Sequence, residues 1–265
     1  MARAYRQPVA LLAAWLAAML SAAPAVATDW TVTLGVDGRV MPTYPGAGSD
    51  RLIPIPLFDL RQAGTPRHFS SPRDGLSIGV LDSGGFRAGI TGKAQLPRRQ
   101  SDSPDLAGLG NVDWAIEPGL FVEYWPVSWL RTRAEIRQGI GGHHGQVGDL
   151  SADFVMPVSP SLTLSGGPRL ALATSNALQP YFGITPAQAA ASIYPAYNAA
   201  GGMHSVGLGG MTRYEWSPQW ATHFYAEYER LTGSAANSPI VTMRGSPNQM
   251  QVGIGATYSF NVKLF

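Results

Sequence analysis

Residues 113–137 read DWAIEPGLFVEYWPVSWLRTRAEIR, and this stretch decides the fold. Two kinds of residue alternate in it with a period of two. One parity holds Trp114, Ile116, Leu120, Val122 and Tyr124, then Leu130, Thr132, Ala134 and Ile136; the other holds Asp113, Glu117 and Glu123, then Arg131, Arg133, Glu135 and Arg137. A strand with one apolar and one charged face is what a β-barrel in lipid requires when its lumen is wet.

The same alternation recurs along the chain and predicts about twelve strands. Their expected ranges are 30–41, 51–61, 67–71, 75–81, 86–96, 113–125, 129–140, 147–156, 161–173, 203–216, 220–231 and 249–261. The weakest is 67–71, and without it and one neighbour the count falls to ten. In the second strand, Pro54 and Pro56 remove ladder donors, which conflicts locally with a central position in a sheet.

Short and long connections alternate between these strands. Short ones rich in turn residues lie at 82–85, 126–128, 157–160 and 217–219, and long ones at 97–112, 141–146, 174–202 and 232–248. The pattern predicts a transmembrane antiparallel up-and-down β-barrel with short periplasmic turns and long extracellular loops. The expected periplasmic ends carry the interfacial tryptophans of such a barrel: Trp30, Trp125, Trp129, Trp216 and Trp220. A soluble exported β-sandwich is the alternative, because its interior would produce the same apolar stripe.

The first 27 residues read as a cleavable signal peptide. Arg3 and Arg6 supply the positive start, residues 9–20 the apolar stretch, and Ala25–Ala27 a small-residue cleavage site. The predicted organisation is therefore a signal peptide over 1–27 and an outer-membrane barrel over 28–265. The chain has no Cys, which excludes a disulfide framework, and its net charge of +2 argues against a nucleic-acid partner.

The charged face predicts a lumen of mixed charge. With a three-residue turn, Glu123 is expected opposite Arg131 and Glu117 opposite Arg137. The predicted lumen network comprises Glu117, Glu123, Arg131, Arg133, Arg137, Glu227 and Glu229. Such side chains either cross-link and fill the lumen or line a narrow polar path, and the mixture of signs favours filling.

Candidate chemical groups are few. His143 and His144 with Asp149 nearby suggest a metal site, but no third ligand follows at a recognisable spacing. His223 near Glu227 could form half of an acid–base pair. Two serines, Ser205 and Ser234, could be nominated as nucleophiles, and Thr43–Gly48 imitates a phosphate-binding loop without its Lys or helix. We predict no catalytic, cofactor-binding or metal-binding residues, and a protein that is not an enzyme.

Three segments resemble a known family. They are Pro42–Ala47 (PTYPGA) followed by Arg51, Pro54 and Pro56, then Tyr181–Ala189 (YFGITPAQA), and Arg230–Ile240 (RLTGSAANSPI), with Tyr258–Phe260 fitting as well. In these the chain is similar to the MipA/OmpV family of Gram-negative outer-membrane proteins. The resemblance implies an outer-membrane barrel and, by the best-known relative, a scaffold joining a lytic murein transglycosylase to a murein synthase. It carries no catalytic residues.

The resulting hypothesis is a non-enzymatic scaffold for peptidoglycan remodelling in the cell envelope, surrounded by outer-membrane lipids. The alternatives are a small-solute channel or binder, whose selectivity would be set by the polar lumen and the 174–202 loop, and a surface adhesin that uses residues 235–248. At the C-terminus, the alternation ends with Tyr258 and Phe260 and five residues follow. We expect the last strand to stop at Phe260, while a bulge would instead extend it to Phe265.

Overall fold

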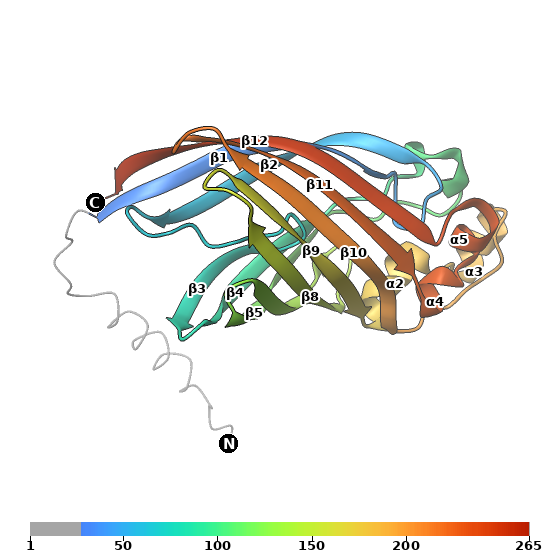
Figure 1. Cartoon of the computed structure of the whole chain (residues 1–265). Helices are drawn as coiled ribbons and strands as arrows, with labels where there is room; N and C mark the ends of the chain where they lie inside the picture. The colour runs from blue at the N-terminus through green and yellow to red at the C-terminus, as the bar shows by residue number, and fades with distance from the viewer. Residues whose placement is uncertain (1–27, 265) are drawn as a thin grey trace, which may run out of the picture.

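The structure, a computed structural model, describes residues 28–264. These residues form one antiparallel sheet that curls around a lumen, with short helices gathered at one end (Figure 1). The predicted all-β fold class is thereby confirmed. The predicted signal peptide, residues 1–27, lies outside the described residues.

Twelve strands make up the sheet. In chain order they are β1 (Thr28–Pro42), β2 (Asp50–Gln62), β3 (Leu76–Ser83), β4 (Phe86–Gln95), β5 (Ala115–Val127), β6 (Leu130–Gln138), β7 (Ile140–Gly141), β8 (Gln146–Pro157), β9 (Leu162–Ala173), β10 (Gly202–Glu215), β11 (Trp220–Leu231) and β12 (Asn248–Leu264). Eleven of them follow one path, β2-β1-β12-β11-β10-β9-β8-β6-β5-β4-β3, and the two-residue β7 pairs with β5.

The two faces of the sheet differ as the alternation predicts. Large apolar side chains such as Ile254, Leu208 and Ile116 are about two-thirds exposed on the outside, whereas Arg131 and Glu123 are buried inside. A β-sandwich would bury the apolar face between two sheets, so the single curled sheet makes that alternative wrong. Apolar outside and charged inside is the distribution of a barrel wall in a bilayer.

None of the helices within residues 28–264 is long and apolar enough to cross a bilayer.

The two ends of the sheet also differ. One, the turn end, has the short connections from β3 onward and both described chain ends; the other, the cap end, collects the long ones apart from the 63–75 coil between β2 and β3 (Figure 1). The long connections contain the 3-10 turns η1 (Gln100–Asp102) and η2 (Pro104–Leu106) and the helices α2 (Ser175–Phe182), α3 (Pro186–Ala191), α4 (Gly233–Ala236) and α5 (Pro239–Arg244). The expected alternation of short and long connections is therefore confirmed from β3 onward.

Two expected strand ranges are wrong. Residues 67–71 form no strand, so the count of twelve is reached through β7, a two-residue continuation of the predicted 129–140 strand. The last strand does not stop at Phe260. It continues in unbroken register against β1, from Phe260 opposite Val32 to Leu264 opposite Thr28, because β1 supplies backbone partners over the whole of that length. Phe265 lies outside the described residues.

The β5–β6 register differs from the expected one by two residues. Glu123 lies opposite Arg133, not Arg131, and Arg137 lies opposite Gly119, not Glu117. The connection is a two-residue turn after Val127, and β5 carries one extra residue between Tyr124 and Val127. A shift of two keeps every side chain on its face, so the charged faces of both strands still meet in the lumen.

The position of β2 at an edge of the sheet explains its prolines. Ala63 N donates to Asp29 O at 2.8 Å and Ser49 O accepts from Thr43 N at 2.9 Å, so the odd-numbered backbone groups of β2 face β1. Pro54 and Pro56 therefore point away from β1, where no ladder donor is required. Proline at a free edge is a known way to block further strand pairing.

The lipid-facing interpretation predicts a large effect for Ile254→Arg. Ile254 lies on the outer face of β12 and is 68% exposed. An arginine on the lipid face of a barrel costs about 2–4 kcal/mol near the bilayer midplane, and we expect that loss in the free energy of unfolding measured by urea titration in liposomes. Met243→Arg is the control, because exposed Met243 lies in α5 at the cap end. Equal stability of the two variants would contradict a lipid-facing wall.

Candidate functional site

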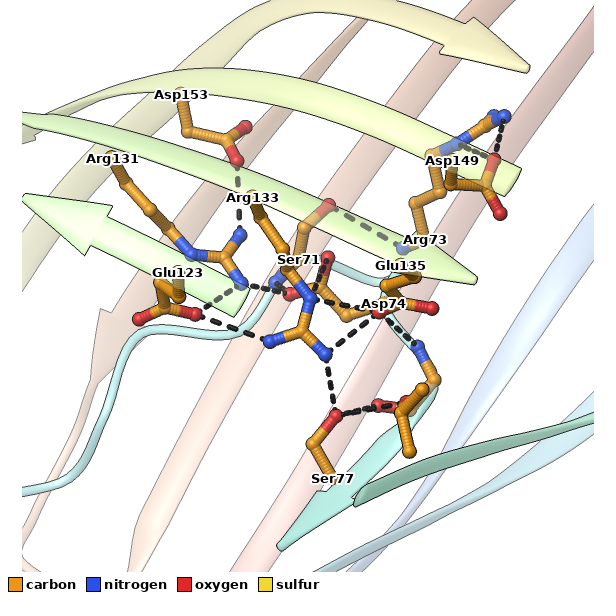
Figure 2. Close-up of polar contacts among 12 residues, drawn as sticks. Ser71, Arg73, Asp74, Ser77, Glu123, Arg131, Arg133, Glu135, Asp149 and Asp153 are labelled. Carbon is orange, nitrogen blue, oxygen red and sulfur yellow. Dashed lines mark hydrogen bonds and ion pairs between the residues drawn. The ribbon is translucent and has the colours of Figure 1, made fainter. Parts of the chain in front are cut away.

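The lumen is crossed by a network of arginine–carboxylate ion pairs centred on Arg131. Its guanidinium lies 2.8 Å from Glu123 on β5, 3.1 Å from Asp153 on β8 and 2.7 Å from Asp74 in the coil before β3 (Figure 2). The Arg131 side chain is 1% exposed. A single arginine thus ties two wall strands and a coil segment to β6.

Arg133 and Arg137 extend the network along β6. Arg133 binds Glu123 at 3.2 Å and Glu135 at 2.7 Å. Arg137 binds Glu117 at 3.0 Å, Glu135 at 2.5 Å and Asp149 at 2.6 Å. The predicted residues of this hairpin therefore do come together, although through diagonal as well as direct cross-strand contacts.

The coil before β3 supplies Arg73 and Asp74 to the middle of the lumen. Arg73 lies 2.7 Å from Asp149 of β8, and 2.7 Å from Glu227 and 2.9 Å from Glu229 of β11, so it neutralises carboxylates from two strands that are not neighbours. In Figure 2 the Arg73 side chain reaches Asp149, while Asp74 turns toward the arginines of β6. Sequence reasoning missed both residues, because nothing in the RHFSSPRDG segment distinguishes a lumen coil from a solvated loop.

Removing any one member of this network is costly. Ionised groups buried without a partner lose several kcal/mol of solvation, whereas a fully paired network roughly recovers that loss. On β9, Arg169 continues the pairing with Asp153 at 2.6 Å and Glu227 at 3.5 Å, and Glu227 also accepts from the Tyr225 hydroxyl. The described lumen is held by mutual neutralisation and contains charges of both signs.

The network is joined to the cap end through His143. Its Nε2 lies 2.9 Å from Glu117 Oε1, and its ring packs edge-on to Tyr181 of α2 with centroids 6.1 Å apart. His143 is buried while His144 is exposed. Asp149 is engaged by Arg73 and Arg137, and residues 28–264 contain no group of three or more His, Asp or Glu placed to hold a metal ion.

The long connections pack on one another into a cap with its own apolar interior. One cluster contains Val112, Ala173, Ala177, Leu178, Tyr181, Phe182, Ala199, Leu231, Ala235 and Val241, and a second contains Tyr44, Ala47, Leu106, Leu109, Ile184, Tyr194 and Ile240. The three family-like segments all contribute to these clusters. Their packing into one body is not apparent from the sequence.

Hydrogen bonds from side chain to backbone fix the cap across the connections. Arg98 donates to Tyr181 O at 2.9 Å, the Tyr194 hydroxyl to Asp105 O at 2.8 Å, and Ser238 Oγ to Phe182 O at 2.6 Å. Burial raises the pKa of the Tyr181 hydroxyl to about 12, as it does for Tyr44. These phenols therefore stay neutral within the cap at physiological pH.

The other candidate groups do not form a catalytic arrangement. His223 lies 3.8 Å from Asp37, while Glu227 is bound by Arg73 and Tyr225. Ser205 Oγ donates to Glu229 at 2.8 Å. Ser234 Oγ lies 3.0 Å from the Tyr197 hydroxyl within the cap. Each serine is thus engaged by a neighbour other than His223.

The five tryptophans lie at the turn end but divide between the two faces. Trp129, Trp216 and Trp220 are at least half exposed, and Trp30 shares the outward parity of β1. Trp125 points inward: its Nε1 donates to Glu123 at 3.0 Å and its ring contacts Phe69. Trp125 was predicted to lie at the membrane interface, and it instead faces the lumen, next to the bulge after Tyr124.

A polar pocket of about 430 Å³ opens at the turn end. Its lining residues are Thr31, Arg61, Gly64, Pro218, Gln219, Tyr258, Ser259, Phe260 and Asn261. Thr31 donates to Asn261 at 2.8 Å across the β1–β12 ladder, so the pocket wall is an ordered array of hydroxyl and amide groups. This end therefore presents polar groups, in contrast to the packed cap.

The network predicts a large stability loss for Arg131→Met. The substitution leaves Asp74, Glu123 and Asp153 with one partner fewer in a buried site, and breaking such a pair costs about 3–5 kcal/mol. The readout is the urea midpoint of the refolded protein in liposomes. Arg230→Met is the matched control, since exposed Arg230 bonds Asn248 and no carboxylate within residues 28–264, and its replacement should change stability by less than about 0.5 kcal/mol. Similar values for both variants would contradict a network that holds the wall.

Comparison with known proteins places the chain in a family. Among solved structures it is similar to the NanC porin (8% identity, 88% of this chain and 99% of that chain, TM-score 0.43) and to an outer-membrane channel of Pseudomonas putida F1 (11%, 90% and 97%, 0.44). It also matches a bacterial polysaccharide outer membrane secretin (11%, 86% and 98%, 0.45). No curated protein sequence matches. The family model described as MltA-interacting protein MipA matches residues 34–260, and the chain belongs to that family.

Proposed function

We propose that this protein is a non-enzymatic scaffold of the outer membrane, which holds murein-remodelling enzymes at the turn end of its barrel. The observation that carries the proposal is an interior that is filled with paired charges and covered at one end by a packed cap. The family description, MltA-interacting protein, supports a lytic murein transglycosylase as one partner. A murein synthase is the second partner that a scaffold of this kind would join to it.

The interior is better suited to a structural role than to conduction. A channel needs a path whose groups bind a solute weakly enough to release it. Here Arg131, Arg137 and Arg73 are each committed to three carboxylates. The cap adds two apolar clusters across the end from which a solute would have to enter.

The adhesin alternative is less favoured for a related reason. Its candidate segment, residues 235–248, is not a free loop, because Ala235, Ile240 and Val241 are almost fully buried in the cap. Removing the segment would open that apolar interior. A loss of attachment after deletion would then report loss of the cap as well as loss of a binding loop.

The turn end is the side available to enzymes beneath the membrane. Its connections are short, so they cannot alone supply the roughly 800 Å² per partner of a standard protein interface. The polar pocket at this end is lined by Arg61 and Gln219 together with the aromatic residues Tyr258 and Phe260. Aromatic and arginine side chains around a polar depression form a composition typical of interface centres.

Single-channel recording tests the scaffold against the channel. We expect the refolded protein, shown to be folded by a heat-modifiability gel, to give no steady current in planar bilayers. Its interior charges are paired with one another and the cap end is packed. A salt-dependent current that changes on Arg133→Ala would favour the channel and overturn the scaffold.

Binding of a purified lytic murein transglycosylase tests the scaffold directly. The Arg61→Ala, Gln219→Ala double variant should weaken binding by about tenfold, because both side chains line the turn-end pocket. Biolayer interferometry on protein in nanodiscs measures the dissociation constant. Met243→Ala, Arg244→Ala at the cap end is the matched control and should bind as the unchanged chain does. Absence of binding by the unchanged chain would refute the proposal, and equal weakening in both variants would refute the assigned face.

A further inference from the structure

The sheet is left open between β2 and β3. Its main path contains eleven strands, each antiparallel to its neighbours, so the two edge strands run in the same direction. Within residues 28–264, β2 pairs only with β1 and β3 only with β4. Lipid-exposed sheet edges do not persist in a hydrocarbon core, because their backbone groups have no partner there. An additional strand between these edges would have to run antiparallel to both of them.

The chain between β2 and β3 has the turns of such a strand at both of its ends. Thr65 N donates to Gln62 O, which makes a β-turn at residues 62–65 with Gly64 at a φ of 82°. Asp74 N donates to Ser71 O at 2.9 Å, which makes a second β-turn at residues 71–74. A strand between these two reversals would run antiparallel to both β2 and β3.

The two turns specify matching registers. Extending the first turn as a hairpin places Phe69 opposite Phe58 of β2, and extending the second places Phe69 opposite Leu76 of β3. Phe58 is 51% exposed and Leu76 60% exposed on the outer face. Both registers therefore put Phe69 in one lipid-facing row with an aromatic and an aliphatic neighbour, a pairing that stabilises strands.

The prolines of β2 begin where this strand would end. In the same register, residues 66–70 lie opposite residues 57–61, and the free-edge amides there belong to Phe58 and Leu60. Pro54 and Pro56 follow immediately beyond, opposite the second turn and its Pro72. The donors of the free edge are thus present along this stretch and absent past it.

In the described arrangement the stretch lies in the lumen. Phe69 packs edge-on to Trp125 with centroids 6.2 Å apart, and the Arg131 guanidinium lies 5.1 Å above its ring. Arg73 and Asp74 hold the second turn in the ion-pair network. Movement of the five residues between the turns would break the contacts of Phe69 and the ion pair between His68 and Asp82, whose atoms lie 3.5 Å apart.

Residues 66–70 are coil in the structure, although the sequence predicts a strand over 67–71. We propose that this coil forms a closing strand in a second arrangement, in which it leaves the lumen and pairs between β2 and β3 to complete a barrel of twelve long strands. The exchange moves Phe69 from Trp125 and Arg131 to the outer row beside Phe58. The proposal concerns the wall alone and applies equally to a scaffold or a channel.

Engineered disulfides test the exchange, since the chain has no cysteine of its own. Phe58→Cys with Phe69→Cys reports the wall position, and Phe69→Cys with Trp125→Cys reports the lumen position. The control is Phe58→Cys with His68→Cys, whose side chains would lie on opposite faces of the wall. After mild oxidation in liposomes, the Phe58–Phe69 pair should cross-link on the order of tenfold more than the control, because only directly opposite residues meet disulfide geometry. Cross-linking of the Phe69–Trp125 pair alone would overturn the proposal.

A single spin label at position 69 gives an independent readout if a double variant fails to fold. A nitroxide on Phe69→Cys should show a component that collides with oxygen dissolved in lipid, whereas one on His68→Cys should not. Absence of the lipid-accessible component at position 69 in the folded protein would refute a closing strand.

Discussion

The rest of the structure depends on the mutual neutralisation of charges inside the sheet. The outer face is apolar, so charged side chains of the wall can only point inward, and inside they must satisfy one another. Arg131 shows the consequence, because it holds Glu123 of β5, Asp153 of β8 and Asp74 of the coil at once. Hydrogen bonds of the ladder join neighbouring strands only. Most of the ion pairs reinforce neighbouring strands, as Arg131 of β6 does with β5 and β8. Two arginines also link strands that are not neighbours: Arg169 of β9 reaches Glu227 of β11, and Arg73 of the coil joins β8 to β11.

The cap is held together mainly by apolar packing and by hydrogen bonds to the backbone rather than by ion pairs. Long connections at the end of a barrel carry backbone groups that need partners and apolar side chains that need cover. Here the connections supply both to one another: Ser238 bonds the backbone of Phe182, and Ile240 packs with Tyr44. His143 links the two bodies, since it contacts Glu117 in the lumen and Tyr181 in the cap. A short buried contact therefore joins the cap to the ion pairs of the lumen.

The sequence was sufficient for the faces of the strands and insufficient for whatever depends on contacts distant in the chain. Period-two alternation predicts which side chains turn inward, and a register error of two residues in β5–β6 left that result intact. The error came from a turn that consists of Ser128 and Trp129, not of residues 126–128, together with one extra residue beside Trp125; no local pattern revealed either. The cap and the lumen position of Arg73 were missed because loop segments have no periodicity from which their packing could be inferred. The prolines of β2 were a correct signal of an edge, but the edge could be recognised only once strand order was known.

The open edge of the sheet and the filled lumen both involve the coil between β2 and β3. Arg73 lies among Asp149, Glu227 and Glu229, so the wall carries more negative charge there than its own arginines neutralise. The coil must therefore keep its basic residue inside, whatever else it does. The proposed closing strand has two tasks, because its segment supplies a cation to the lumen and backbone partners to the wall. The turn at residues 71–74 is held in place by its ion pairs, whereas the five residues before it are not. The sequence meets that constraint by placing the charges of Arg73 and Asp74 in the turn and the apolar ring of Phe69 in the stretch. The residues that pair charges in the lumen, Arg73 and Asp74, thus follow only a few positions after Phe69, which would face lipid in the closed wall.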